Sequence, residues 1–193
     1  IVGFGLGDVS KKRLFDYASP DAEAMEITAK NINPYLVAAG DVIVDSRTTP
    51  ICEVPQMSFG SMPNDGGFLL LDSNERKELL GIEPAAKKYI RPFLGSQEFI
   101  NNQERWCIWL VDVSPAEMRM MPEIMKRIEK VKENRSQSKR EATNKLAKTP
   151  YLFGEIRQPD SDYLLIPGVS SELREYVPIG FMNKEVVASN LAY

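Results

Sequence analysis

The chain has 193 residues, of which 43% are apolar and 26% charged, a balance that supports a hydrophobic core and excludes a disordered polymer. Its net charge is −3 and it contains no histidine, which excludes Ser-His-Asp and Cys-His catalysis and zinc sites with histidine ligands. The sequence has no run of about 18 apolar residues, so it predicts no transmembrane helix.

The predicted elements mix strands and helices without a regular strand–helix–strand rhythm, which indicates an α+β fold with mixed, mostly antiparallel sheet elements. Apolar, β-branched and aromatic runs predict strands at residues 42–44, 68–71, 105–111, 163–166, 176–181 and 186–188. Helices are predicted at residues 73–81, with Ser73 as the N-cap, and at 83–89. Since one domain takes roughly 150 residues, we expect a single domain over residues 1–193.

A long helical segment is predicted at residues 114–148. It begins with Ser-Pro-Ala-Glu at 114–117, a capping box with proline at the first helical position. Pro122 is expected to kink or restart the helix. Apolar residues at 124, 128 and 131 form a stripe with helical spacing, whereas residues 134–141 contain no strongly apolar side chain. We therefore expect residues 134–141 to face solvent or a partner.

Basic residues are numerous along this helical segment. Residues 119–148 contain ten Lys or Arg against four Glu, so this window is positive although the whole chain is acidic. The polar side chains between the basic residues, together with their charge, suit phosphate oxygens. The residues predicted to contact a nucleic-acid backbone are Arg135, Lys139, Arg140 and Lys145. A solvated helix face remains the alternative.

A second polar cluster lies at residues 170–176. If this segment is extended, Glu172, Arg174 and Tyr176 share one face, because strand side chains alternate. Glu accepts a hydrogen bond from the cytosine amino group, and Arg donates two bonds to guanine. The alternative is an exposed strand edge with salt bridges. Ser170 and Ser171 are added as hydroxyl donors to the nucleic-acid backbone.

Other motifs indicate local structure. The glycines at 3, 5 and 7 resemble a nucleotide loop, but no matching helix follows, and we interpret them as a loop or hairpin. Asn33-Pro34-Tyr35 lacks the second proline of an amino-methyltransferase motif and is interpreted as a turn. The two cysteines, Cys52 and Cys107, allow at most one disulfide. The apolar neighbours of Cys107 favour a buried, reduced thiol instead. The strand-like start, with Ile rather than Met, suggests part of a longer protein.

Several ordered motifs together carry a resemblance to a known family. They lie at residues 32–36, 59–67, 91–96, 106–110, 150–159 and 163–181. Over about residues 27–190 the chain resembles the target-recognition domain of MmeI-like (type IIL) restriction–modification enzymes, which are adenine-specific DNA methyltransferases. This resemblance implies a domain that selects the DNA sequence.

The resemblance also implies a division of labour within a longer polypeptide. An upstream methyltransferase domain would use S-adenosylmethionine to methylate the exocyclic amino group of adenine. This chain would then bind double-stranded DNA, hold no cofactor or metal and catalyse nothing. The implied location is the prokaryotic cytoplasm. Whether the parent polypeptide also cuts DNA is left open.

Specificity residues in the family cluster in the segment that matches residues 170–176. The resemblance therefore implies that Glu172 and Arg174 are the leading base-contacting pair, with Tyr176 as a third. Ser96, within the motif at 91–96, is expected either to meet a DNA phosphate or to serve the fold. Two rival functions remain: a protein–protein interaction module that uses the basic helix, and a methyltransferase catalytic unit.

Overall fold

The computed structural model describes residues 2–171 and 173–193. The chain forms two compact units, Ile1–Pro55 and Gln56–Tyr193, which are described one by one. Helices and small, mostly antiparallel sheets occur together, which confirms the predicted α+β class. A single recognition domain over residues 1–193 stays a prediction.

The first unit contains a two-stranded antiparallel hairpin that the sequence analysis did not predict. Strands β1 (Lys12–Asp16) and β2 (Met25–Ala29) pair with Leu14 opposite Ile27. Arg13 donates two hydrogen bonds to the carboxylate of Glu26 across the strands. Only Ala29 of the two strands is buried. Strands with so little buried surface do not need the strict alternation of apolar and polar residues by which a strand is recognised in a sequence.

Two predictions in the first unit have different outcomes. Asn33 forms a turn as expected, because its side-chain oxygen accepts hydrogen bonds from the N–H groups of Tyr35 and Val37 at 3.0 and 3.1 Å. The strand predicted at residues 42–44 is wrong. These residues have no regular structure and are 63–74% exposed. An apolar run forms a strand only where a neighbouring strand accepts its hydrogen bonds and a core covers its side chains.

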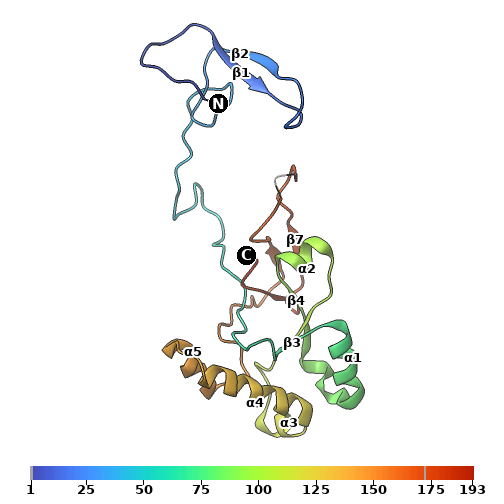
Figure 1. The fold of residues 1–193 in the computed structure, drawn as a ribbon. Helices are drawn as coiled ribbons and strands as arrows, with labels where there is room; N and C mark the ends of the chain where they lie inside the picture. The colour runs from blue at the N-terminus through green and yellow to red at the C-terminus, as the bar shows by residue number, and fades with distance from the viewer. Residues whose placement is uncertain (1, 172) are drawn as a thin grey trace. The chain divides into compact units, whose positions relative to one another are not determined.

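The second unit is built on a four-stranded sheet with the order β3-β5-β4-β8 (Figure 1). Its strands are β3 (Leu70–Leu71), β4 (Ile90–Leu94), β5 (Trp106–Ile108) and β8 (Val187–Ala188). Neighbours are antiparallel except β4 and β8, which run parallel with Phe93 opposite Val187. The strands predicted at 68–71, 105–111 and 186–188 are present but shorter.

Most helices of the second unit follow local sequence signals. They are α1 (Ser73–Ile82), η1 (Pro84–Tyr89), α2 (Ser96–Asn101), α3 (Pro115–Arg119), α4 (Pro122–Ser136), α5 (Glu141–Lys145) and η2 (Leu146–Lys148). The capping box at Ser114 and Glu117 is confirmed. The N-cap of α1 is Asp72 rather than Ser73, and it forms its own capping box with Glu75. The helical segment at 114–148 is thus several short helices.

The main core lies between this sheet and the helices. Leu69, Ile108, Ile124 and Val131 are fully buried in it. Cys107 is also buried and unpaired, as expected, and its burial raises the pKa of the thiol. A second, smaller cluster is centred on Leu165, Ala188 and Ala192. It supports the hairpin of β6 (Tyr163–Leu165) and β7 (Gly180–Met182), in which Leu165 pairs with Gly180.

Candidate nucleic-acid interface

Arg135 belongs to the buried scaffold, so its predicted contact with a DNA backbone is wrong. The residue has no exposed surface. Its guanidinium donates five hydrogen bonds of 2.8–3.0 Å to main-chain carbonyls. The acceptors are the carbonyls of Pro63, Asn64, Leu146, Thr149 and Leu152. Since a guanidinium has five N–H donors, no donor remains for a phosphate.

The burial of Arg135 has a signal in the sequence. Ile124, Ile128 and Val131 face the core, and position 135 continues their spacing along α4. Burial lowers the pKa of the Arg135 guanidinium, and the nearby Asp65 carboxylate opposes that shift. The side chain joins the loop at residues 63–64 to the segment at 146–152. The position of residue 135 on the helix, rather than its charge, is therefore the sequence signal that indicates its buried role.

Other predicted backbone-contacting residues are exposed. Lys139 and Arg140 lie in the turn between α4 and α5, so the helix expected to carry all four basic residues is interrupted after Ser136. Lys145 is exposed and forms an ion pair of 2.8 Å with Glu141, one helical turn away. These side chains have access to a partner.

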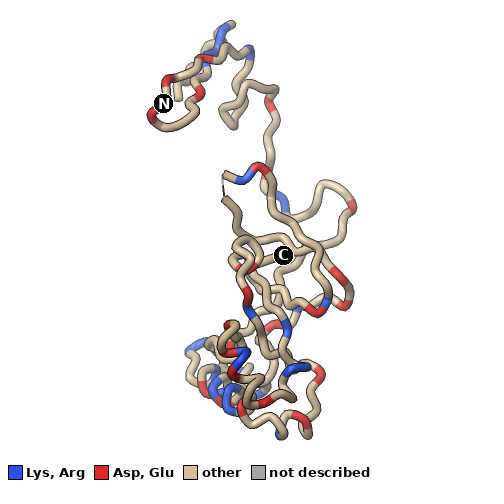
Figure 2. Tube along the Cα trace, turned by 90° about the vertical axis from the view of Figure 1, so that its right-hand side faces the viewer, with Lys and Arg blue, Asp and Glu red and all other residues tan. Residues whose placement is uncertain are grey.

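Acidic residues are interleaved with the basic ones along α4 (Figure 2). Lys126 pairs with Glu123 at 2.7 Å, and Arg127 with Glu75 at 3.0 Å. A groove of about 690 Å³ between α1 and α4 is lined by five glutamates. They are Glu75, Glu78, Glu123, Glu129 and Glu133. This side of α4 therefore does not provide a continuous positive surface for a phosphate backbone.

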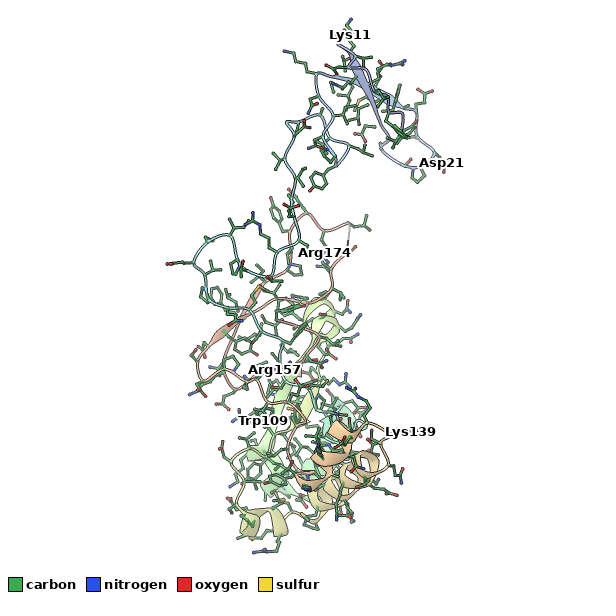
Figure 3. All side chains as sticks on the ribbon, turned by 90° about the vertical axis from the view of Figure 1, so that its left-hand side faces the viewer. Lys11, Asp21, Trp109, Lys139, Arg157 and Arg174 are labelled. Atoms are coloured by element: carbon green, nitrogen blue, oxygen red, sulfur yellow. The ribbon has the colours of Figure 1, made fainter. Side chains whose placement is uncertain are left out.

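The polar cluster at 170–176 lies in the loop between β6 and β7, residues 166–179, which we call the β6–β7 loop. Glu172 lies outside the described residues. Ser170, Ser171, Arg174 and Tyr176 are all exposed, with Tyr176 at 77% (Figure 3 labels Arg174). Their side chains can therefore reach a partner without rearrangement of the core.

The extended conformation that would place Glu172, Arg174 and Tyr176 on one face is not present at Leu173 and Arg174. The N–H of Arg174 donates to the carbonyl of Ser171 at 3.0 Å, and the N–H of Leu173 donates to the Ser171 hydroxyl at 3.2 Å. These bonds close a turn, and β7 begins only at Gly180, so the strand predicted at 176–181 is shorter than expected. Side chains of the loop therefore do not alternate as they would on a strand.

Ser96 also has a different position from the one expected for a phosphate contact. The residue is 2% exposed at the start of α2. Its hydroxyl donates to the carbonyl of Leu191 and accepts from the N–H of Gly168 at 2.9 Å. Both bonds are internal, so of the two roles considered for Ser96 the structure supports the one in the fold.

Comparison with known proteins identifies the family. A model described as the MmeI target recognition domain matches residues 38–193. The chain belongs to the MmeI target recognition domain family. Over its whole length it is 38% identical to DNA methyltransferase A of Bacillus subtilis (strain 168), of which it spans 21%.

A solved structure supports the same assignment. The type IIL restriction–modification enzyme MmeI, in a structure described as a complex with DNA, matches 97% of this chain with a TM-score of 0.78 and 45% identity. The chain spans 25% of that protein. The MmeI target recognition domain model covers the whole second unit and leaves out the β1–β2 hairpin.

Two further features of this MmeI-type domain concern membranes and metal ions. None of the helices in the described residues has both the length and the apolar character needed to cross a membrane. Within the same residues, no group of three or more cysteines or carboxylates is arranged to hold a metal ion.

Proposed function

We propose that this chain recognises a specific sequence in double-stranded DNA as part of a longer DNA methyltransferase. The observation that carries the proposal is the exposed β6–β7 loop, which lies within the part of the chain matched by the target recognition domain family. Its arginine and tyrosine project from a unit whose own core is complete without them. The exposed side chains of this loop are therefore available to contact DNA.

Arg174 is the leading base-reading residue in this proposal. A guanidinium donates two hydrogen bonds to the O6 and N7 atoms of guanine in the major groove, which discriminates one base pair from the others. Glu172 is assigned to the amino group of a cytosine, and Tyr176 to a further contact with a base edge. All three are close in the sequence, so they would address neighbouring base pairs.

The exposed basic residues Lys139, Arg140 and Lys145 are assigned to the DNA backbone, together with Ser170 and Ser171. In Figure 3, Lys139 and Arg174 lie at separate places in the second unit. A duplex in contact with both would therefore run along the unit. Backbone contacts made by Lys139 would add affinity and fix the register, while base preference would come from the β6–β7 loop.

Methyl transfer is assigned to the rest of the parent polypeptide. The relative named DNA methyltransferase A is about five times as long as the matched part, which supports this division. S-adenosylmethionine would bind in the parent's methyltransferase domain. The glycines at 3, 5 and 7 do not fit a cofactor loop, because the strand β1 follows them instead of the helix that such a loop leads into. This chain would then contribute no catalytic group, and the bacterial relative supports action in the cytoplasm.

The β1–β2 hairpin supports a contact between the first unit and that methyltransferase domain. Met25 and Ile27 lie on one face of the hairpin with Leu14, and both are exposed. An isolated two-stranded hairpin is marginally stable in water. The hairpin lies outside the target recognition domain model but inside the match to the methyltransferase. We assign this apolar face to packing against the methyltransferase domain.

Fluorescence anisotropy with a randomised short DNA duplex tests the proposal. We expect binding that weakens steeply between about 50 and 200 mM salt, because released counterions favour the complex at low salt. Sequencing of the retained duplexes should then give a preferred site. Absence of binding by the full-length parent at low salt would contradict the proposal and favour an interaction module. Micromolar heat on titration with S-adenosylmethionine would instead favour a catalytic unit.

A further inference from the structure

Helix α2 contacts both ends of the β6–β7 loop through residues one turn apart. Ser96 is its first residue and Phe99 follows three positions later, so the two side chains lie on the same side of the helix. Figure 1 shows α2 beside β7, at the base of the loop. The helix follows directly on β4, a strand of the main sheet, and is therefore tied to the core.

Ser96 fixes the start of the loop. The N–H of Gly168 donates to the Ser96 hydroxyl at 2.9 Å and to the Leu191 carbonyl at 3.0 Å, and Ser96 itself donates to that same carbonyl. A Cβ atom on Gly168 would lie 2.9 Å from the Leu191 oxygen. These contacts close a triangle, of which the Ser96 side is buried, that holds the backbone where the loop leaves the body of the unit.

Phe99 fixes the end of the loop. A Cβ atom built on Gly180 would lie 2.6 Å from Cε2 and 2.8 Å from Cζ of the Phe99 ring, closer than real Cβ atoms approach. Gly180 is also the residue that pairs with Leu165 at the end of β6. The ring therefore determines how close β7 lies to α2, and glycine is required at 180 for this contact.

We infer that α2 positions the β6–β7 loop, with Ser96 and Phe99 acting as positioning residues for Arg174. The inference rests on the proposed function, in which Arg174 reads a base. Fixing both ends reduces the conformations that an exposed loop explores, and such preorganisation strengthens discrimination because less order has to be gained on binding. Ser96 and Phe99 would then affect sequence preference without touching DNA.

Two substitutions in the full chain disturb the two ends separately. Ser96→Ala removes the hydroxyl, and Gly180→Ala places a methyl group against the Phe99 ring. The control is Ser161→Ala, which makes the same chemical change at an exposed serine outside the loop. Combining Gly180→Ala with Phe99→Leu removes the ring that the methyl group meets. This double variant should restore whatever Gly180→Ala disturbs.

Hydrogen–deuterium exchange of the free chain provides the first measurement. We expect faster exchange confined to the β6–β7 loop, residues 166–179, in Ser96→Ala and Gly180→Ala, with wild-type behaviour in Ser161→Ala and in the double variant. Unchanged exchange of the loop in both single variants would overturn the inference whether or not the chain binds DNA. Faster exchange throughout the second unit would also overturn it, because the residues would then be merely structural.

Selection from the randomised duplex pool provides the second measurement. We expect the preference at the base pair assigned to Arg174 to fall roughly tenfold in each single variant, about what one lost hydrogen bond produces, with an unchanged salt slope. The double variant should recover the preference. If the loop exchanges faster while the sequence preference is retained, α2 still holds the loop but the proposed base-reading role of the loop is wrong.

Discussion

The second unit has two polar regions in which arginine serves opposite purposes. In the helical region from α4 to η2, Arg135 is buried and donates every N–H group to a main-chain carbonyl. In the β6–β7 loop, Arg174 is exposed at the end of a turn. The first arginine is part of the scaffold, whereas the second is available to a partner.

The difference shows that charge in a sequence does not by itself locate an interface. Both arginines stand among Ser, Glu and other polar residues. What separates them is the phase of the surrounding structure, since Arg135 continues a buried helical stripe and Arg174 follows no stripe. Substitutions in the first region should therefore change the free energy of unfolding, and substitutions in the second should change binding.

The largest effect is expected for Arg135→Met. Five main-chain carbonyls would lose their hydrogen-bond donor, and each polar group left unsatisfied and buried costs about 1–3 kcal/mol before water or relaxation compensates. We expect the free energy of unfolding to fall by about 3 kcal/mol or more in urea denaturation followed by tryptophan fluorescence. Arg135→Lys, with three donors, should lose less. A loss below about 1 kcal/mol for Arg135→Met would contradict a scaffold role.

Arg174→Ala should have the next largest effect, on binding alone. We expect a loss of about 1–3 kcal/mol in affinity for the preferred duplex and a relaxed preference at one base pair. Arg174→Lys keeps the charge but loses the paired donors, so it should also relax the preference. The free energy of unfolding should change by no more than about 0.5 kcal/mol. Equal weakening for all duplexes would show that Arg174 does not read a base.

A smaller effect is expected from acid at Glu117, which lies in α3, just before the helical region. Hydrogen bonds from Lys88 and then from Ser114 lower the pKa of Glu117 to about 2 from the usual 4.5. Stability from this carboxylate is present above about pH 4.5 and is lost as the pH falls towards 2, because the unfolded chain binds the proton more readily. Glu117→Gln should flatten the stability profile between those pH values. An unchanged profile would show that the Glu117 carboxylate does not contribute to the stability of the folded chain.

The smallest effect is expected for Lys139→Ala. Because the side chain is exposed, the free energy of unfolding should stay within about 0.5 kcal/mol of wild type. DNA affinity should weaken equally for all sequences, and the slope of log affinity against log salt should flatten by about 0.9. Measurement of that slope by anisotropy is the test. A changed base preference would exclude a backbone contact for Lys139.

Local sequence signals predicted the helices better than the strands. The capping box at Ser114 and Glu117 and the restart at Pro122 depend on neighbouring residues, and both are confirmed. The predicted strand at 42–44 fails because pairing depends on a partner that may be anywhere in the chain. The same limit explains why the β1–β2 hairpin was missed, since most of its residues are exposed on both faces.

Predictions for the candidate site follow the same division. The exposure of Ser170, Ser171, Arg174 and Tyr176 agrees with a predicted contact surface, but their base and backbone contacts stay predictions. Arg135 was misassigned, and the role of Ser96 was left open, because the partners of both residues come from distant segments. Gly168 and Leu191 surround Ser96, and residues 63–64 and 146–152 surround Arg135.

The parallel pairing of β4 with β8 has a consequence for synthesis on the ribosome. Phe93 and Leu94 of β4 can pair with Val187 and Ala188 of β8 only after the ribosome has synthesised the more than ninety residues between them. Closing so long a segment carries an entropic penalty and slows folding. The helices and the β4–β5 pair can form on the emerging chain, while the edge of β4 stays open to wrong partners until translation reaches β8. Of the four strands of this sheet, β8 is thus the one made last, and its pairing completes the sheet.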